Sequence, residues 1–250
     1  MSIKFRRFIH FFDRILLNNK VVHINIMLYR IRKEGLCLYT ELVMNIIGII
    51  GIGAFAASGA IFATKKHTDP FGTIVVAVIT ACGGGITRDI LLGIAPPKTL
   101  VDPAYILISA SVALFVYLIA FIMKDSFCEK TKRLDIAINI FDALGLGAFS
   151  VMGTQNAIDY GFSQNMFLCI LIGVLTGCGG GFLRDITLQE IPVVLKKHIY
   201  VIAAILGSAA FYSMYISGSS YTLSAFWGIV LTFSLRMVAT RFNWNLPPAY

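Results

Sequence analysis

Charged residues are scarce in this chain. Only 14% of its 250 residues are Asp, Glu, Lys or Arg, whereas 57% are hydrophobic. Soluble globular proteins carry about 25% charged residues, so this composition excludes an ordinary soluble domain. A surface so poor in charge suits lipid as its solvent, and the sequence therefore predicts an all-α polytopic membrane protein.

The sequence also lacks the motifs of metal centres and common enzymes. Its five cysteines show no CxxC or Cys/His spacing, and no catalytic triad or nucleophile elbow is present. The stretch "GIGAFA" at Gly51–Ala56 matches the dinucleotide fingerprint G-x-G-x-x-A. That fingerprint requires a preceding strand, whereas the run here is continuously apolar. We therefore expect no enzyme activity, no cofactor and no metal.

Seven apolar segments dominate the chain. Each approaches or exceeds the roughly 20 residues that cross a hydrocarbon core about 30 Å thick, and turn and charge signals separate them. We predict transmembrane helices near Glu41–Thr64, Phe71–Gly93, Pro103–Met123, Leu134–Ile158, Phe162–Leu188, Lys197–Ile216 and Tyr221–Ala239.

Residues 1–40 form a basic N-terminal extension of a different kind. Lys and Arg are mixed there with Phe, Ile and Leu, and the cleavage site of a signal peptide is missing. One interpretation is an amphipathic helix on anionic lipid. The alternatives are a disordered tail, or translated sequence upstream of a true start at Met27 or Met44.

The net charge of +8 is spread over the tail and the loops. Because no compact domain gathers it into one binding face, we expect a lipid bilayer as partner and no nucleic acid. The side reached after the first, third, fifth and seventh segments carries ten Lys and Arg residues, against two on the other side without the tail. The positive-inside rule then predicts a cytoplasmic C-terminus, although the basic tail argues for the opposite orientation.

An internal repeat organises the apolar segments. "TACGGGITRD" at Thr80–Asp89 returns as "TGCGGGFLRD" at Thr176–Asp185, 96 residues later. "GIGAFAASG" at Gly51–Gly59 likewise returns as "GLGAFSVMG" at Gly145–Gly153. Three crossings separate equivalent positions, so the second copy is inverted. We predict a first three-helix repeat at 41–127, a second at 134–216 and a seventh transmembrane helix at 221–239.

The two glycine runs are the centre of the predicted site. Three glycines near mid-membrane are expected to interrupt the helix and to expose backbone groups that line a cavity. If so, Gly84→Ala and Gly180→Ala preserve or raise stability while flux falls. The alternative is close helix packing through small residues, for which alanine would lower stability.

The Arg-Asp pairs that follow the glycines have three interpretations. They bind the two charges of a zwitterion, they gate a pore by changing partners, or they form structural salt bridges. Asp142, Glu190, Thr80 and Thr176 are secondary candidates that are better explained by helix packing. The predicted transport pathway comprises Gly83, Gly84, Gly85, Arg88, Asp89, Asp142, Gly179, Gly180, Gly181, Arg184 and Asp185.

The duplicated GGGxxRD frame, with "AFAASGA", "DPFG" at Asp69–Gly72 and "DALGLGAF" at Asp142–Phe149, resembles a bacterial seven-helix family. This family is known both as relatives of trimeric intracellular cation channels and as the glycine-transporter-domain family. The resemblance spans roughly 43–241. It implies a homotrimer in the bacterial cytoplasmic (inner) membrane, with one pathway per protomer, kinked at the glycine motifs of the second and fifth helices. The chain departs from the family at Gly48, where the first repeat usually has an acidic residue.

Two transport activities fit these features. We predict an inner-membrane transport protein that moves a small solute, glycine or a similar zwitterion, because the inverted repeat favours a carrier. The alternative is a trimeric monovalent cation (potassium) channel. A membrane scaffold without transport activity would need only helix packing, and the paired glycine motifs disfavour it.

Overall fold

The computed structural model describes residues 39–122, 131–196 and 199–242. The predicted basic extension at 1–40 therefore lies almost wholly outside the described residues. Residues Met44–Tyr250 form one compact unit, and of the other unit, Met1–Val43, only the start of a helix is described. Within the described ranges every regular element is helical, which confirms the predicted all-α class.

Seven of the described helices are long and apolar enough to cross a membrane, as predicted. Two short helices, α3 (Lys98–Val101) and α8 (Val193–Lys196), follow the second and fifth of them. A π-helical turn, Ile158–Phe162, extends the fourth. The seven are Tyr39–Lys65, α2 (Pro70–Leu91), α4 (Pro103–Ile122), α6 (Thr131–Ala157), α7 (Met166–Thr187), α9 (Ile199–Ile216) and α10 (Tyr221–Arg241).

Equivalent caps start the central helix of each repeat. The Asp69 side chain accepts a hydrogen bond of 2.6 Å from the Gly72 amide at the start of α2. Asn165, 96 residues later, accepts one of 3.0 Å from the Leu168 amide at the start of α7. Side-chain acceptors at this position satisfy amides that have no partner within the helix. The fifth span consequently begins after Asn165, a few residues later than predicted.

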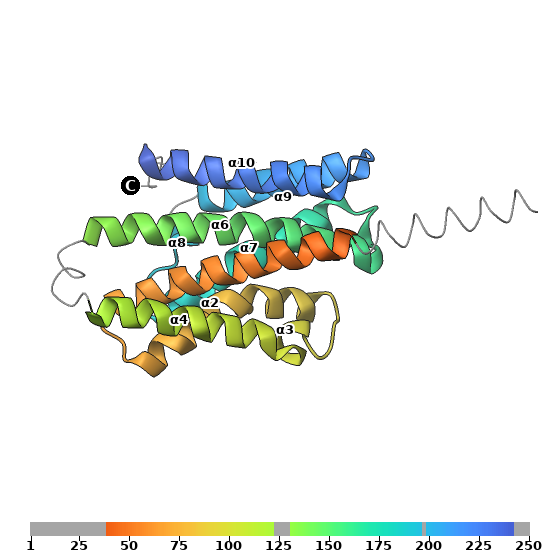
Figure 1. Ribbon diagram of the computed structural model, residues 1–250. Coiled ribbons are helices and arrows are strands. Elements are labelled where there is room, and N and C mark those ends of the chain that lie inside the picture. The colour runs from red at the N-terminus through yellow and green to blue at the C-terminus, as the bar shows by residue number, and fades with distance from the viewer. Residues whose placement is uncertain (1–38, 123–130, 197–198, 243–250) are drawn as a thin grey trace, which may run out of the picture. The chain divides into compact units, whose positions relative to one another are not determined.

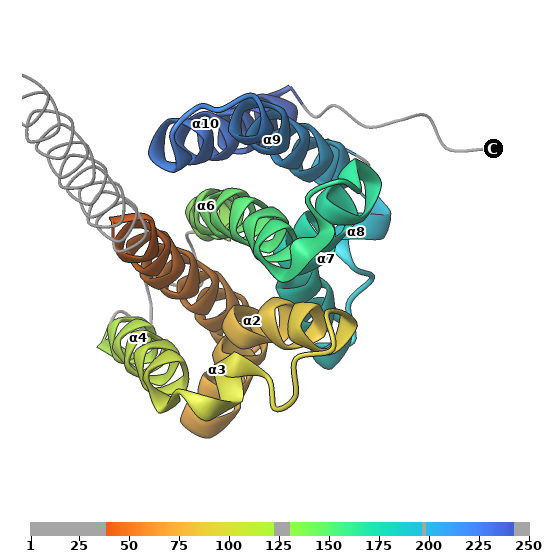
Figure 2. The same cartoon turned by 90° about the vertical axis from the view of Figure 1, so that its right-hand side faces the viewer.

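Helices α6 and α7 lie between the α9–α10 pair and the α2–α4 pair, as the end-on view shows (Figures 1 and 2). Helix α7 contacts α2, α6 and α9, so the centre of the unit is built around it. Small residues allow these close approaches. A Cβ atom on Gly59 would lie 2.5 Å from Thr80 Oγ1, and one on Gly153 would lie 2.5 Å from Thr176 Oγ1. The same packing thus occurs in both inverted repeats.

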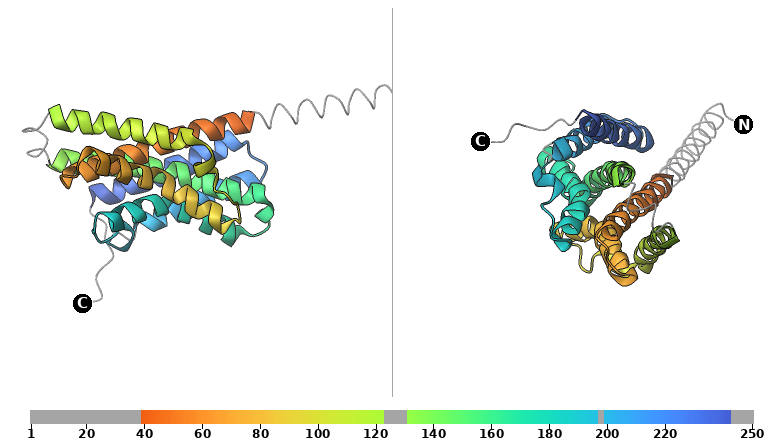
Figure 3. Two further views of the ribbon diagram at one scale, coloured as in Figure 1. Left: turned by 90° about the horizontal axis from the view of Figure 1, so that it is seen from below. Right: turned by 90° about the vertical axis from the view of Figure 1, so that its left-hand side faces the viewer.

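Ion pairs and a ring contact between helix ends confirm that the helices alternate in direction. Lys65, at the end of the first span, binds Asp135 at the start of α6 with an N–O distance of 2.6 Å. Lys66 pairs with Glu190, which follows α7. At the opposite ends, Lys98 lies 5.3 Å from the ring centre of Tyr160. The long helices run alongside one another in all views (Figure 3).

Candidate transport site

Both glycine runs lie inside continuous helices. Helix α2 passes through Gly83–Gly85 and helix α7 through Gly179–Gly181 without a break, so the predicted helix interruptions are wrong. The reason is a direct contact between the helices. A Cβ atom on Gly84 would lie 2.0 Å from the Thr176 carbonyl oxygen, and one on Gly180 would lie 2.0 Å from that of Thr80.

The third glycine of each run faces polar atoms. A Cβ atom on Gly181 would lie 3.0 Å from the Tyr200 hydroxyl, 3.6 Å from Asp142 Oδ1 and 3.8 Å from Arg184 Nη2. In the first repeat, a Cβ atom on Gly85 would lie 3.0 Å from Thr99 Oγ1 and 3.8 Å from Arg88 Nη2. The glycine contact is thus flanked by one polar cluster in each repeat.

The first glycine of each run differs from the third, because it faces no charged group. A Cβ atom on Gly83 would lie 2.6 Å from Leu183 Cδ1, and one on Gly179 would lie 3.2 Å from the Gly84 Cα. Gly83 and Gly179 therefore belong to the helix–helix contact.

Each Arg-Asp pair is a closed salt bridge that also anchors a loop. Arg88 binds Asp89 Oδ1 through Nε (2.8 Å) and Nη2 (2.7 Å), while Asp89 Oδ2 accepts a 2.8 Å bond from the Lys98 amide. Arg184 binds Asp185 Oδ1 through the same two nitrogens, both at 2.9 Å. Asp185 Oδ2 accepts a hydrogen bond of 2.8 Å from the backbone amide of Val193. Two-point contacts of this kind fix the guanidinium plane.

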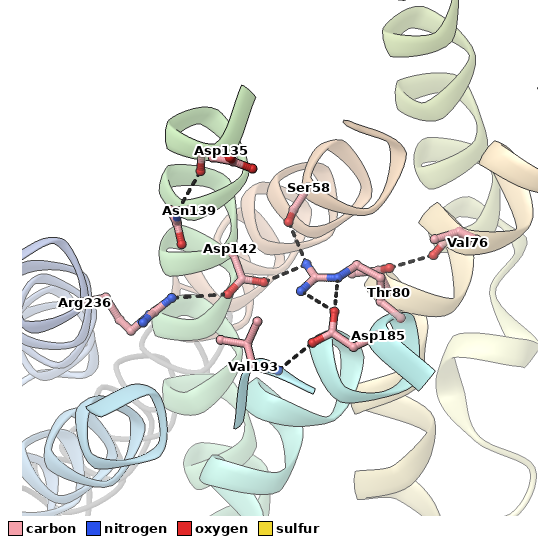
Figure 4. Close-up of polar contacts among 10 residues, drawn as sticks. Ser58, Val76, Thr80, Asp135, Asn139, Asp142, Asp185, Val193 and Arg236 are labelled. Carbon is pink, nitrogen blue, oxygen red and sulfur yellow. Dashed lines mark hydrogen bonds and ion pairs between the residues drawn. The ribbon is translucent and has the colours of Figure 1, made fainter. Parts of the chain in front are cut away.

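Among the described residues, Arg184 has further partners that its counterpart in the first repeat, Arg88, lacks. Its Nη1 donates to Ser58 Oγ at 2.8 Å and to Asp142 Oδ1 at 3.0 Å. Figure 4 shows Ser58, Asp142 and Asp185 converging from three helices, with Arg236 approaching Asp142 from the other side. The structure therefore brings three predicted residues, Asp142, Arg184 and Asp185, into one buried cluster.

Arg236 is one of the ten basic residues that were counted on the side reached after the seventh segment, although the predicted seventh helix, Tyr221–Ala239, contains it. It lies within α10 and is only 2% exposed. Its Nη2 is 3.9 Å from Asp142 Oδ2, and its Cζ is 4.6 Å from the Tyr200 ring centre. An arginine inside an apolar segment is a functional candidate by default, so the sequence could have identified Arg236. Ser58 and Tyr200 carried no such signal. Because Arg88 is also buried in its helix, the loop charge bias becomes nine to one.

The first repeat has no acidic residue at the position equivalent to Asp142, and a methionine side chain fills the space there. Gly48 and Met152 stand 94 residues from Asp142 and Ser58, respectively, at the equivalent positions of the other repeat. A Cβ atom on Gly48 would lie 3.2 Å from the Met152 Cε methyl. An apolar contact thus replaces the Asp142–Arg184–Ser58 connection.

Three of the four secondary candidates, Thr80, Thr176 and Glu190, behave as structural residues. The Thr80 and Thr176 hydroxyls donate to the carbonyl oxygens four residues earlier, each at 2.6 Å. Glu190 lies outside the membrane-spanning helices, where its ion pair with Lys66 lowers the pKa of the carboxyl below its ordinary value.

Comparison with known proteins gives one consistent result. The family model described as "Glycine transporter" matches the chain twice, at residues 45–121 and 139–216. A UPF0126 membrane protein of Vibrio cholerae is 34% identical over 82% of this chain and 82% of its own. The UPF0126 inner membrane protein YadS of Escherichia coli is 30% identical over 80% of this chain and 93% of its own.

Solved structures of cation channels match over nearly their whole length. A prokaryotic TRIC channel solved in 0.5 M KCl has a TM-score of 0.74 and 36% identity, covering 82% of this chain and 100% of the channel. The trimeric intracellular cation channel orthologue from Rhodobacter sphaeroides has a TM-score of 0.73 and 31% identity, covering 81% and 99%.

Proposed function

The chain belongs to the glycine transporter family, a family of membrane transport proteins, and we propose that it is a monovalent cation channel. The likeness to solved TRIC cation channels, which extends over almost all of those channels, carries this proposal. The sequence analysis had predicted a carrier of a small zwitterion, with the cation channel as the alternative, and the likeness favours the alternative. The residues alone favoured a carrier, because an inverted repeat is typical of carriers; the solved channels match this chain over the same two repeats and the seventh helix, so the repeat does not separate the two activities.

The pathway that we propose follows the polar clusters on the two sides of the glycine contact. The cluster at Gly181 supplies the Tyr200 hydroxyl and the Asp142 carboxylate, and that at Gly85 supplies the Thr99 hydroxyl. Oxygen ligands of this kind can replace the hydration shell of a cation. The contact of Gly84 with Thr176 closes the space between them, so conduction requires α2 and α7 to separate there.

A zwitterion site fits these residues less well. Arg88 and Asp89 already bind each other, as do Arg184 and Asp185, and the second oxygen of each carboxylate holds a backbone amide. Binding a zwitterion would have to break a buried salt bridge in each case, and a buried charge that loses its partner is costly. These pairs are better explained as anchors of the loops that follow α2 and α7.

The assembly and location that we propose are those of a homotrimer in a bacterial inner membrane. The structural neighbour from Rhodobacter sphaeroides is described as trimeric, and the Escherichia coli relative as an inner membrane protein. The nine-to-one loop bias supports a cytoplasmic C-terminus.

A flux assay on purified protein in liposomes tests the function. We expect a potassium gradient to dissipate through the protein, while labelled glycine shows no saturable uptake. Protein-free liposomes measure the leak, and valinomycin marks complete potassium release. The family description favours glycine as the second candidate. Saturable glycine uptake without potassium flux would establish that carrier instead.

A further inference from the structure

Arg236 enters the buried cluster from α10, the helix that lies outside the repeats. Its contact with Asp142 Oδ2, at 3.9 Å, is longer than a hydrogen bond. Within the described part of the chain, its buried Nε has no hydrogen-bond partner. Apart from this ion pair, the guanidinium rests on the ring of Tyr200. Arg236 is therefore loosely held for a buried arginine.

Arg184, in the same cluster, is held by several short hydrogen bonds and ion pairs. Its Nε and Nη2 bind Asp185, and its Nη1 binds both Ser58 and Asp142, all within 3.0 Å. Since a buried charge is stabilised only when its donors are satisfied, Arg184 is a fixed structural partner. Arg236 can exchange its partner at a smaller cost.

Asp142 differs in the same way from Asp89 and Asp185, the other two buried carboxylates in the described part of the chain. Asp89 and Asp185 each have one oxygen on an arginine and the other on a backbone amide. Asp142 has Oδ1 on Arg184, whereas Oδ2 faces the loose contact with Arg236. Oδ2 also lies toward α10, away from Ser58 and Asp185 (Figure 4).

The charges of the cluster balance only while Asp142 keeps one further cation. Arg184 and Asp185 neutralise each other, which leaves the charge of Asp142 to Arg236. A monovalent cation can take the place of the guanidinium and keep the cluster neutral. A divalent cation would leave one positive charge in excess, at a high cost in a buried site.

We propose that Arg236 is a tethered cation that occupies, on Asp142, a binding site for a monovalent metal cation such as potassium. The proposal rests on the proposed channel function and identifies Arg236 as the residue that limits how strongly the pathway holds its ion. When potassium binds Asp142, the displaced guanidinium keeps the Tyr200 ring as a cation–π partner.

The test removes the charge of Arg236 and measures potassium binding separately from flux. Melting temperature is recorded against potassium concentration for wild type, Arg236→Met and Arg236→Gln, with N-methylglucamine holding the ionic strength constant. We expect both variants to bind potassium about tenfold more tightly than wild type, the factor that corresponds to about 1.4 kcal/mol. The double variant Asp142→Asn/Arg236→Met, which lacks the carboxylate, should lose this response.

The matched control is Arg241→Gln, which removes the same charge from an exposed position of the same helix and should behave as wild type. An unchanged potassium response in folded Arg236 variants would overturn the inference, and so would failure of both to fold, because a displaceable group cannot be required for folding. Potassium flux through wild type is scored independently. A conducting wild type with unchanged variants rejects only this inference, whereas a wild type without potassium flux rejects the channel.

Discussion

Gly84 on α2 faces the carbonyl oxygen of Thr176 on α7 so closely that a methyl group would lie 2.0 Å from that oxygen. Gly180 and Thr80 repeat the relationship with the helices exchanged. The oxygen belongs to a helix backbone and cannot rotate aside as a side chain would. The middle glycine of each run is therefore required by close approach rather than by flexibility.

Gly84→Ala and Gly180→Ala are expected to lower stability, contrary to what the sequence predicted. The added methyl group forces the two helices apart, and overpacking of this kind costs about 1–3 kcal/mol or more. Thermal unfolding of the detergent-solubilised protein measures the loss, and cross-linking measures whether the assembly is disturbed with it.

Gly53→Ala is the matched control for these two variants. It lies in the first membrane helix, and a Cβ atom there would meet nothing within 4 Å. Alanine is favoured over glycine in a helix by about 1 kcal/mol, so the melting temperature should stay the same or rise. Equal stability of all three variants would show that the contact between α2 and α7 is not tight.

Asp185→Ala should destabilise the protein by about 3–5 kcal/mol, because it removes one partner of a buried ion pair. The variant leaves Arg184 with Asp142, Ser58 and the ring of Phe62, and it frees the loop amide at Val193. Asp135→Ala breaks the exposed pair with Lys65, for which about 0–1 kcal/mol is expected. Comparable unfolding free energies for the two variants would contradict a structural role of the buried pair.

Gly48→Asp restores an acid at the position that corresponds to Asp142, and we expect it to destabilise the protein. The new carboxylate would be buried against the apolar side chain of Met152, whose methyl group lies 3.2 Å from the position of a Cβ atom and would have to shift. Gly48→Asp/Met152→Ser also restores the counterpart of Ser58 and should recover stability, because Arg88 could then bind both. The melting temperatures of the single and double variants test this expectation. If the double variant is less stable than Gly48→Asp alone, the two repeats do not hold their arginines in the same way.

Glu190→Gln should change how stability depends on pH. Lys66 lowers the pKa of Glu190 below its ordinary 4.5 in the folded protein. The stabilisation is therefore complete above the ordinary pKa and is lost as pH falls through the lowered folded value. We expect a small melting-temperature advantage of wild type at neutral pH, which disappears in acid and in high salt. A difference that is independent of both would exclude an electrostatic origin.

A reporter fused after Ala239 should be active only if it functions in the cytoplasm. The nine-to-one bias of loop charges is the physical reason, since Lys and Arg stay on the cytoplasmic side during insertion. A cysteine placed at Lys98 should accordingly react with a membrane-impermeant thiol reagent from outside. Labelling of that cysteine only in inverted vesicles would reverse the proposed orientation.

The sequence by itself determined the class, the seven spans and the inverted repeat. These depend on local properties: apolar length, turn residues, and the spacing of "TACGGGITRD" and "TGCGGGFLRD". Lipid requires every backbone group to be satisfied within the segment, so an apolar run of sufficient length predicts a helix without knowledge of its neighbours.

Only the tertiary structure decided what the glycines and arginines do. Whether Gly84 breaks a helix or packs against one depends on where the Thr176 carbonyl lies, and those residues are far apart in the chain. Arg236 joins Asp142 across α10 and α6 for the same reason, since no spacing rule links a seventh helix to a repeat that it does not belong to. Residue pattern fixes the periodicity of each helix, whereas the contacts between helices depend on side-chain volumes that match only after folding.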